Sequence, residues 1–383
     1  MGTQAEQLRS TRDWATWQPS TPYTIGIEEE VMLLDPGDWS LAQRSDDVLP
    51  HLPPGLAEHV TAETHQAAIE LATDPHQTVG DAIAQLRHLR QWLSEELDDL
   101  GLGVAAAGTH PSALWTETQV SPAGRYQLIQ RTMADLARRE PTFALHVHVG
   151  VPDAQRAIRL LNQLRAHLPM LLALSANSPF WQGRATGLAS TRTPVFGVFP
   201  RTGIPRRFAS YEDWVRTVDT LLRAGAFPEP TFLWWDVRPQ PALGTVEVRV
   251  MDAQTDIEAT AALCALVQSL ARLEIEQGYA PPALVGAEEV LEENRFLAAR
   301  DGIEADLLDP DAEMRRPARE QLRRLLDALR PHADSLGCRA ELERVLALAL
   351  APAFLHQLDV VERRGGDLSG LTSELAAAFA PAD

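Results

Sequence analysis

Three segments of this chain alternate between apolar and ionisable residues, and this pattern constrains the fold more than any other feature. In residues 144–151, leucine and valine occupy every second position, and two histidines lie between them. Residues 23–34 and 245–251 alternate in a similar way, with glutamate or arginine in place of histidine. Successive side chains of a β-strand point to opposite faces of a sheet. Each segment therefore predicts a strand with one apolar face and one ionisable face.

The ionisable faces of these strands carry the residues of greatest chemical interest. They are Glu28 and Glu30 in the first strand, His146 and His148 in the second, and Glu247 and Arg249 in the third. A single strand of this kind is explained by a half-exposed sheet whose charges face water. Three such strands favour one shared surface lined by carboxylates and imidazoles. Glu29 lies on the apolar side, and we interpret it as a carboxylate at an edge or an interface.

A further acidic segment, residues 61–73, predicts a short helix. On a helix, Glu63 and Glu70 would lie on one stripe with Ala67 between them. By itself this segment is explained by a solvated helix face. Together with Glu28, Glu30 and Glu247, these two glutamates form a set of hard oxygen donors. Magnesium or manganese suits such a set, and zinc suits it less well.

A long loop, residues 177–207, supplies several arginines. They are Arg184, Arg192, Arg201, Arg206 and Arg207. Arginine binds carboxylate and phosphate groups through two parallel hydrogen bonds. Loops of this length are often functional, and this one is the natural candidate for a lid. Beside an acidic, metal-binding face, it would suit the joint binding of a magnesium–nucleotide and a carboxylate.

The charge balance excludes several kinds of chemistry. Acidic residues outnumber basic ones by 53 to 34, which gives a net charge of −19, and every basic residue is arginine. Without lysine, Schiff-base chemistry, a pyridoxal-phosphate lysine and a Walker-type phosphate loop are all excluded. A strongly acidic chain is also a poor general binder of nucleic acid, so we expect no nucleic-acid partner.

The cysteines and the apolar runs indicate the cellular environment. Cys264 and Cys338 are the only cysteines, which argues against a disulfide framework and for a reducing compartment. We expect Cys264 to be buried in an apolar helix and Cys338 to be exposed. Residues 1–13 are polar, unlike a signal peptide, and the longest apolar runs fall far short of the ~18 residues that span a bilayer. We expect a cytoplasmic protein with no membrane contact.

The order of the predicted elements indicates the fold class. Strands predominate in the first two-thirds of the chain, and the rest is helical. Helices are predicted at residues 77–100, 125–140, 153–177, 211–224 and from 256 onward. This order favours an α+β fold, with a largely antiparallel sheet and helices on one face. We divide the chain into an irregular segment (1–20), a catalytic sheet domain (21–280) and a helical C-terminal region packed on it (281–383).

Four motifs in sequence order carry a resemblance to a known family. They are YTIGIEEE (23–30), HVHVG (146–150), SANSPFWQG (175–183) and WDVRPQPALGTVEVRVMD (235–252). The chain resembles the bacterial carboxylate–amine ligases of the type-2 glutamate–cysteine ligase family, in the glutamine-synthetase-like superfamily. The resemblance implies a curved, mostly antiparallel sheet with helices on its convex face. It also implies ATP and several Mg²⁺ ions, or Mn²⁺, on the concave face, and a homodimer.

The resemblance also implies an activity and roles for individual residues. The activity is the ATP-dependent joining of a carboxylate, usually the γ-carboxyl of glutamate, to an amine such as that of cysteine. The implied metal ligands are Glu28, Glu30, Glu70 and Glu247; Glu63, Arg192 and Arg249 are the implied catalytic residues. His146, His148, Arg192 and Arg249 are implied to bind the nucleotide. Residues 141–144 and the loop after Arg192 depart from the family pattern, which leaves the amine substrate open.

The expected reaction passes through an acyl phosphate. The carboxylate attacks the γ-phosphate of ATP, and the amine then displaces phosphate from the acyl carbon. Glu63 and a bound phosphate oxygen are the two candidates for the base that deprotonates the amine. Three alternatives remain open at this point: a metal-dependent amidohydrolase, a ligase with another amine acceptor, and a relative without turnover.

Overall fold

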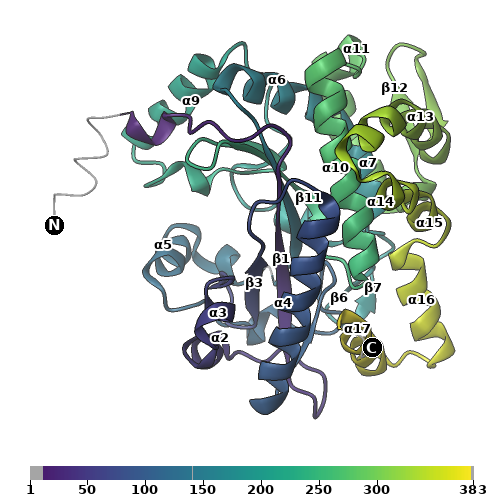
Figure 1. Ribbon diagram of the computed structural model, residues 1–383. Helices are drawn as coiled ribbons and strands as arrows, with labels where there is room; N and C mark the ends of the chain where they lie inside the picture. The colour runs from purple at the N-terminus through teal and green to yellow at the C-terminus, as the bar shows by residue number, and fades with distance from the viewer. Residues whose placement is uncertain (1–11, 140, 381–383) are drawn as a thin grey trace.

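A seven-stranded sheet forms the centre of the protein in the computed structural model, which describes residues 12–139 and 141–380 (Figure 1). The strands follow the order β10-β11-β5-β1-β3-β2, and β4 also pairs with β1. All of these pairings are antiparallel, which confirms the predicted sheet. The strands are β1 (Ile25–Leu34), β2 (Val60–Ala62), β3 (Ala68–Ala72), β4 (Gly103–Ala105), β5 (Ala144–Gly150), β10 (Val237–Gln240) and β11 (Thr245–Asp252).

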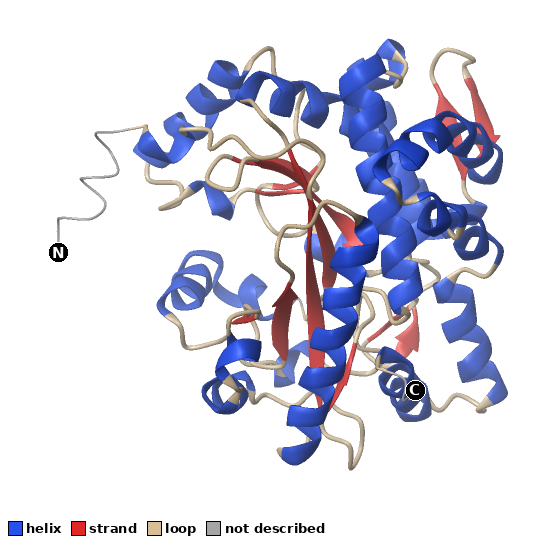
Figure 2. Cartoon of the chain, viewed as in Figure 1, coloured by secondary structure: helices blue, strands red, loops and turns tan. Residues whose placement is uncertain are grey.

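One face of this sheet is covered by helices, as expected. Helix α4 (Val79–Asp99) packs on β1, β3 and β4, and α10 (Ile257–Gln277) packs on β5 and β1. In Figure 2 both helices lie on the same side of the long central strand. The alternating apolar residues point into this layer, so Ile27, Val147 and Val248 are almost completely buried. Burial of this apolar face drives the pairing of sheet and helices.

The remaining elements surround this core. Between β5 and β10 lie α6 (Ala154–Leu164), α7 (Leu168–Ser175), β6 (Phe180–Trp181), β7 (Arg184–Ala185), α8 (Arg192–Phe196), β8 (Thr202–Gly203), α9 (Tyr211–Arg223) and β9 (Trp234–Trp235). Before β5 lie α2 (Ser45–Val48), α3 (Pro54–Ala57) and α5 (Gly124–Met133). In Figure 1, α5 and α9 lie on the opposite side of β1 from α4 and α10.

The C-terminal region is mainly helical. It contains α11 (Pro282–Gly286), α12 (Glu288–Asp301), α13 (Ala318–Leu336), α14 (Arg339–Glu343), α15 (Val345–Leu350), α16 (Ala353–Arg363) and α17 (Leu368–Phe379). The helical pattern is interrupted by a hairpin of β12 (Asp306–Asp309) and β13 (Met314–Pro317). Helices α13 and α14 pack on α10, and α17 packs on β4. The proposed division at residue 280 stays a prediction, and residues 1–11 of the first segment lie outside the described residues.

The helix predicted at residues 61–73 is wrong. These residues form β2 and β3, an antiparallel pair in which Thr61 lies opposite Glu70. Ile69 and Leu71 flank Glu70 and are buried, so the period is that of a strand. Pairing with β1 supplies the backbone hydrogen bonds of β3, and this tertiary context overrides the helical preference of Ala and Glu.

The helix predicted at residues 153–177 is interrupted. Asp153 caps its start by accepting a hydrogen bond from the Arg156 amide, as expected. A 3₁₀ turn, Arg165–His167, then separates α6 from α7. Pro169 at the start of α7 has no N–H to donate to the preceding turn, which explains the break.

The expectation that Glu29 lies at an edge or interface is also wrong. Its carboxylate is completely buried and forms an ion pair with Arg90 of α4, which is equally buried. The Arg90 guanidinium also donates to the carbonyls of Gln254, Thr255 and Phe379, at 2.7, 2.9 and 3.2 Å. This pair therefore joins β1, α4, the segment after β11 and the end of α17.

Both cysteines are buried, so the prediction of an exposed Cys338 is wrong. Cys338 precedes α14, which packs on α10, and its Sγ lies 3.6 Å from Ser269 Oγ. Burial raises the pKa of both thiols, which makes each of them less reactive.

No single helix of the described residues is long and apolar enough to cross a membrane. One bent pair of helical segments, Arg339–Leu350 and Ala353–Arg363, is long and apolar enough when the two are taken together, by length and composition only.

His110 predicts a loss of stability in acid. Its Nδ1 accepts hydrogen bonds from the Ser112 and Ala113 amides at 3.2 and 3.0 Å, so Nε2 carries the proton that is donated to Trp39 O at 2.8 Å. Burial lowers the pKa of His110 to about 4. The unfolded chain therefore binds the proton first as the pH falls below ~6.5. Between pH 7 and pH 5 this residue should remove about 2 kcal/mol from the free energy of unfolding.

Urea denaturation at the two pH values measures this effect. H110N is the matched variant, because the Asn oxygen can accept the same two amides without titrating. The loss of stability between pH 7 and pH 5 should be about 2 kcal/mol smaller in H110N. An equal loss in both proteins would show that His110 contributes nothing to the acid sensitivity.

Candidate active site

The register of the sheet brings together the ionisable residues of four strands. Glu28 of β1 lies opposite His146 of β5, and His148 lies opposite Glu247 of β11. On the other side of β1, Glu30 lies opposite Glu70 of β3. Paired residues of an antiparallel sheet share a face, so these side chains form one continuous surface on the face opposite the helical layer.

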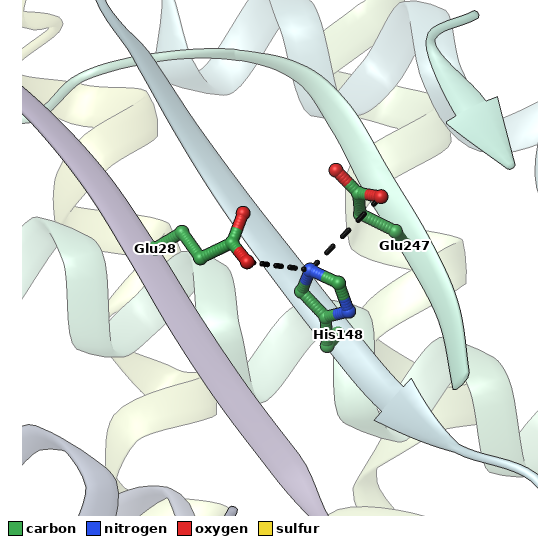
Figure 3. A group of neighbouring side chains, drawn as sticks. All are labelled: Glu28, His148 and Glu247. Atoms are coloured by element: carbon green, nitrogen blue, oxygen red, sulfur yellow. Dashed lines mark ion pairs between the residues drawn. The ribbon is translucent and has the colours of Figure 1, made fainter. Parts of the chain in front are cut away.

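Glu28, His148 and Glu247 form the first group of candidate ligands (Figure 3). His148 Nε2 lies 3.2 Å from Glu28 Oε1 and 4.0 Å from Glu247 Oε2. Burial opposes the charged form of His148, but the attraction of Glu28 and Glu247 raises its pKa. Burial also opposes the charge of Glu28, whose pKa is nevertheless lowered by His148 and His146. At this end of the surface, the imidazole and the carboxylates therefore stabilise each other's charged forms.

The second and third groups are richer in carboxylate. Glu28 and Glu70 converge on His146, whose Nδ1 lies 3.2 Å from Glu28 Oε2 and 3.8 Å from Glu70 Oε2. Glu30, Glu63 and Glu70 form the third group, with ligand atoms within 4.8 Å of one another. Glu63 follows β2 directly, so the hairpin, rather than a helix, brings it to Glu70.

The third group crowds three carboxyl groups together. Burial and repulsion from Glu63 raise the pKa of Glu30 to about 8. Burial and repulsion from Glu28 raise the pKa of Glu70 well above its usual range, and burial raises that of Glu63. Carboxylates crowded in this way favour either protons or a cation between them.

Glu247 is held by residues that sequence reasoning missed. Arg238 Nε and Gln240 Nε2, both on β10, donate to Glu247 Oε2 at 2.6 Å, and Arg249 forms an ion pair with it. Burial alone would raise the pKa of Glu247, but Arg238 and Arg249 keep it well below its usual range. The signal was present in the alternation of residues 237–240.

Of the five loop arginines, the structure brings only Arg192 to the cavity lining described here. Arg184 is exposed, and Arg201 packs on Phe227 and Trp234. Arg206 pairs with Asp213 on α9, and Arg207 is exposed as well. The predicted row of arginines beside the acidic face is therefore wrong, because short elements fold the loop back on itself.

Arg125 and Tyr126 also line the cavity, and sequence reasoning did not find them. Both lie on α5, a segment that carried no motif. The Arg125 guanidinium donates to Thr231 Oγ1 at 2.9 Å and pairs with Glu229. Tyr126 donates its hydroxyl proton to the carbonyl of Ala62, at the end of β2. These contacts join α5 to both edges of the site.

Many of these side chains line one cavity of about 240 Å³. Carboxylates line one part of it: Glu28, Glu30, Glu63 and Glu70. Guanidinium groups line another: Arg125, Arg192, Arg238 and Arg249. The walls are completed by aromatic residues, among them Tyr126, Phe196, Phe199 and Trp234. His148 and Glu247 lie beside this cavity and are almost completely buried.

The candidate ligand atoms of this site suit divalent cations that prefer oxygen ligands. Each of the three groups offers ligand atoms within 4.8 Å of one another, and most of these atoms are carboxylate oxygens. The buried Nε2 atom of His146 has no hydrogen-bond partner among the described residues. Burial and the charge of Arg249 lower the pKa of His146 to about 4, so this imidazole is neutral and able to coordinate. Mg²⁺ and Mn²⁺ suit this chemistry.

Comparison with known proteins decides the family. The family described as glutamate–cysteine ligase family 2 matches residues 24–349. The chain belongs to this family. It is an ATP-dependent ligase that forms a C–N bond, as expected from the four motifs.

Two relatives illustrate the similarity. "Putative glutamate–cysteine ligase 2-3" of Rubrobacter xylanophilus is 40% identical over 365 residues, covering 94% of this chain and 98% of the relative. "Putative glutamate–cysteine ligase 2" of Thermobifida fusca is 36% identical over 370 residues, covering 95% of this chain and 92% of the relative.

Solved structures share the fold at low sequence identity. The glutamate–cysteine ligase of Francisella tularensis, in complex with AMP, has a TM-score of 0.66 at 14% identity, covering 96% of this chain and 91% of that one. A bifunctional glutathione synthetase from Pasteurella multocida has a TM-score of 0.70 at 14% identity. The match covers 93% of this chain and 52% of the synthetase. The glutamine-synthetase-like fold expected from the sequence is thereby confirmed.

Proposed function

We propose that this ligase joins the γ-carboxylate of glutamate to the amine of cysteine through an acyl phosphate. The observation that carries the proposal is one cavity in which carboxylate groups suited to cations adjoin several guanidinium groups suited to phosphate and carboxylate. The family and its named relatives support the glutamate and cysteine assignment. Residues 141–144 and the loop after Arg192 depart from the family pattern, so the test below includes amines other than cysteine.

Activation of the carboxylate is the chemical problem that this cavity addresses. A carboxylate is a poor electrophile because displacement by an amine would expel oxide. Transfer of the γ-phosphoryl group converts that oxygen into part of a phosphate leaving group, and the amine then attacks the acyl carbon. Phosphoryl transfer requires of the protein mainly positioning and neutralisation of charge.

Different residues of the site would position the reacting groups and neutralise their charge. Mg²⁺, when bound by Glu28, Glu30, Glu70, Glu247 and the adjacent histidines, would neutralise the phosphates and orient them. Arg192 and Arg249 would stabilise the oxygens of the transferred phosphoryl group. Arg238 holds Glu247 in its ionised form. Closure of the loop 177–207 would keep water from the acyl phosphate.

Glu63 is one of two candidates for the base that accepts the amine proton. Burial raises its pKa, which makes this carboxylate a stronger base. One of its oxygens accepts a hydrogen bond from the Thr64 amide at 2.9 Å, and this contact orients the group. A phosphate oxygen of the nucleotide is the other candidate.

Phosphate release from ATP tests the proposal. The full chain is incubated with Mg²⁺, ATP and glutamate, and amines are added one at a time, with cysteine among them. Release should require both glutamate and one amine, should stop with EDTA and should return with excess Mg²⁺. Mass spectrometry of the product then names the amide. ATP binding without release for any pair would contradict the glutamate assignment and direct the search to another carboxylate donor.

A further inference from the structure

Asp252, the last residue of β11, is a completely buried carboxylate that the mechanism above does not use. Its Oδ2 accepts hydrogen bonds from the Asn177 amide at 2.9 Å and the Ser178 hydroxyl at 2.7 Å. Its Oδ1 accepts one from the Ser190 hydroxyl at 2.8 Å and lies 4.0 Å from a guanidinium nitrogen of Arg192. Among the described residues, the hydrogen bonds and the ion pair of this carboxylate therefore all go to the segment that ends at Arg192.

These contacts close the loop that precedes α8. Ser178 stands at its beginning and Ser190 near its end, and Asp252 binds both. The two ends are also joined through the backbone, since the Ser178 amide donates to Ala189 O at 3.2 Å and the Thr191 amide donates to Ser178 O at 2.9 Å. The Arg192 amide donates to Ser178 Oγ at 3.2 Å. Asp252 thus fixes the backbone from which the Arg192 side chain extends.

The Arg192 side chain is fixed by the same strand. Two of its nitrogens donate to the carbonyls of Arg249 and Val250, each at 3.1 Å. These carbonyls lie where the pairing of β11 with β5 shifts register, between Val248 and Met251. Such an irregularity leaves backbone groups without ladder partners and often lies beside an active site. Arg192 Nε has no hydrogen-bond partner among the described residues, so one donor remains for a ligand.

Gly108 shows how closely this arrangement is packed. A Cβ at Gly108 would lie 2.6 Å from Asp252 Cγ and 2.8 Å from Ser178 Oγ. The Gly108 amide also donates to the carbonyl of Asn177 at 3.1 Å. Only glycine allows the backbone to approach the carboxylate this closely.

We propose that Asp252 is a positioning residue for Arg192, which it holds, together with Ser178 and Ser190, in place for the γ-phosphate of ATP. The proposal rests on the proposed function in one respect, the contact of Arg192 with that phosphate. Asp252 itself touches neither substrate nor nucleotide. Its effect on ligand binding should therefore pass entirely through Arg192.

Nucleotide binding tests this without any need for the true substrates. The dissociation constants of β,γ-methylene-ATP and ADP, each with Mg²⁺, are measured by calorimetry for the wild type and D252N. D252N should bind the ATP analogue about tenfold more weakly, since a charge-assisted contact is displaced, and ADP within about threefold of wild type. A merely structural defect would weaken both nucleotides alike, and that outcome would overturn the proposal.

A double-mutant cycle separates the two residues. R192A should show the same selective loss, and D252N should add nothing in the R192A background. Additive losses, or an unchanged preference for the ATP analogue in R192A, would also overturn the proposal. S190A removes only one hydrogen bond to Asp252 and should give a smaller loss in the same direction. Should D252N not fold, S190A with R192A completes the cycle. Failure of glutamate as a substrate would leave these binding results unaffected.

Discussion

Glu28→Gln should reduce the rate of phosphate release at least about a thousandfold, since it removes a negative oxygen at the centre of the site. Glu28 belongs to two of the three candidate ligand groups and lies 3.2 Å from both His146 and His148. Glutamine keeps the shape of the side chain but cannot supply an anionic ligand. Loss of this one charge should therefore affect both groups at once.

Two measurements distinguish loss of chemistry from loss of fold. The thermal midpoint without metal should stay within a few degrees of wild type, whereas the stabilisation produced by Mg²⁺ with ATP should be largely lost. Glu58→Gln is the matched control, because Glu58 is an exposed glutamate at the end of α3, and it should retain wild-type activity. An E28Q enzyme with near-normal turnover would remove Glu28 from the metal site.

Arg90→Met should destabilise the protein by about 3–5 kcal/mol, because it leaves a buried carboxylate without its partner. Glu29 would remain at 0% exposure with no cation beside it. The carbonyls of Gln254, Thr255 and Phe379 would lose their donor as well. Each such unsatisfied group adds to the cost of the substitution.

Urea denaturation measures this effect, and the same helix offers a control. Arg87 of α4 forms an ion pair with Glu258, but both side chains are exposed, at 52% and 39%. Arg87→Met should therefore cost less than about 1 kcal/mol. Removing both buried charges, as in E29L/R90M, should restore part of the stability lost in R90M. Equal effects of R90M and R87M would show that burial of the pair is not important.

Much of the fold and the site could be predicted from alternation alone. The strands that carry Glu28, His146, His148 and Glu247 were correct, and so was the face on which each residue lies. These predictions succeeded because an alternating strand with one buried face has one stable orientation. Glu63 and Glu70 line the same cavity as Glu28 and Glu30, but the element predicted for them was wrong, since short strands lack a strong local signal.

The errors share a physical cause. Glu29 and Cys338 are buried because α4 and α14 pack against elements distant in sequence. The loop arginines are dispersed because each finds a different local partner, such as Asp213 for Arg206. Arg125, Arg238 and Asp252 act through partners on other segments, and neither spacing nor composition specifies such partners.

The sequence by itself determined the alternating strands, the acidic and imidazole-lined face, the absence of lysine chemistry and the family. These properties need no knowledge of tertiary contacts, since they follow from alternation within short segments, from composition and from the order of motifs along the chain. Only the tertiary structure decided which side chains meet: the pairing of Glu29 with Arg90, the support of Glu247 by Arg238 and Gln240, and the closure of the Arg192 loop on Asp252. Strand register and helix packing bring these groups within hydrogen-bond distance, and both are set by burial of the whole apolar core.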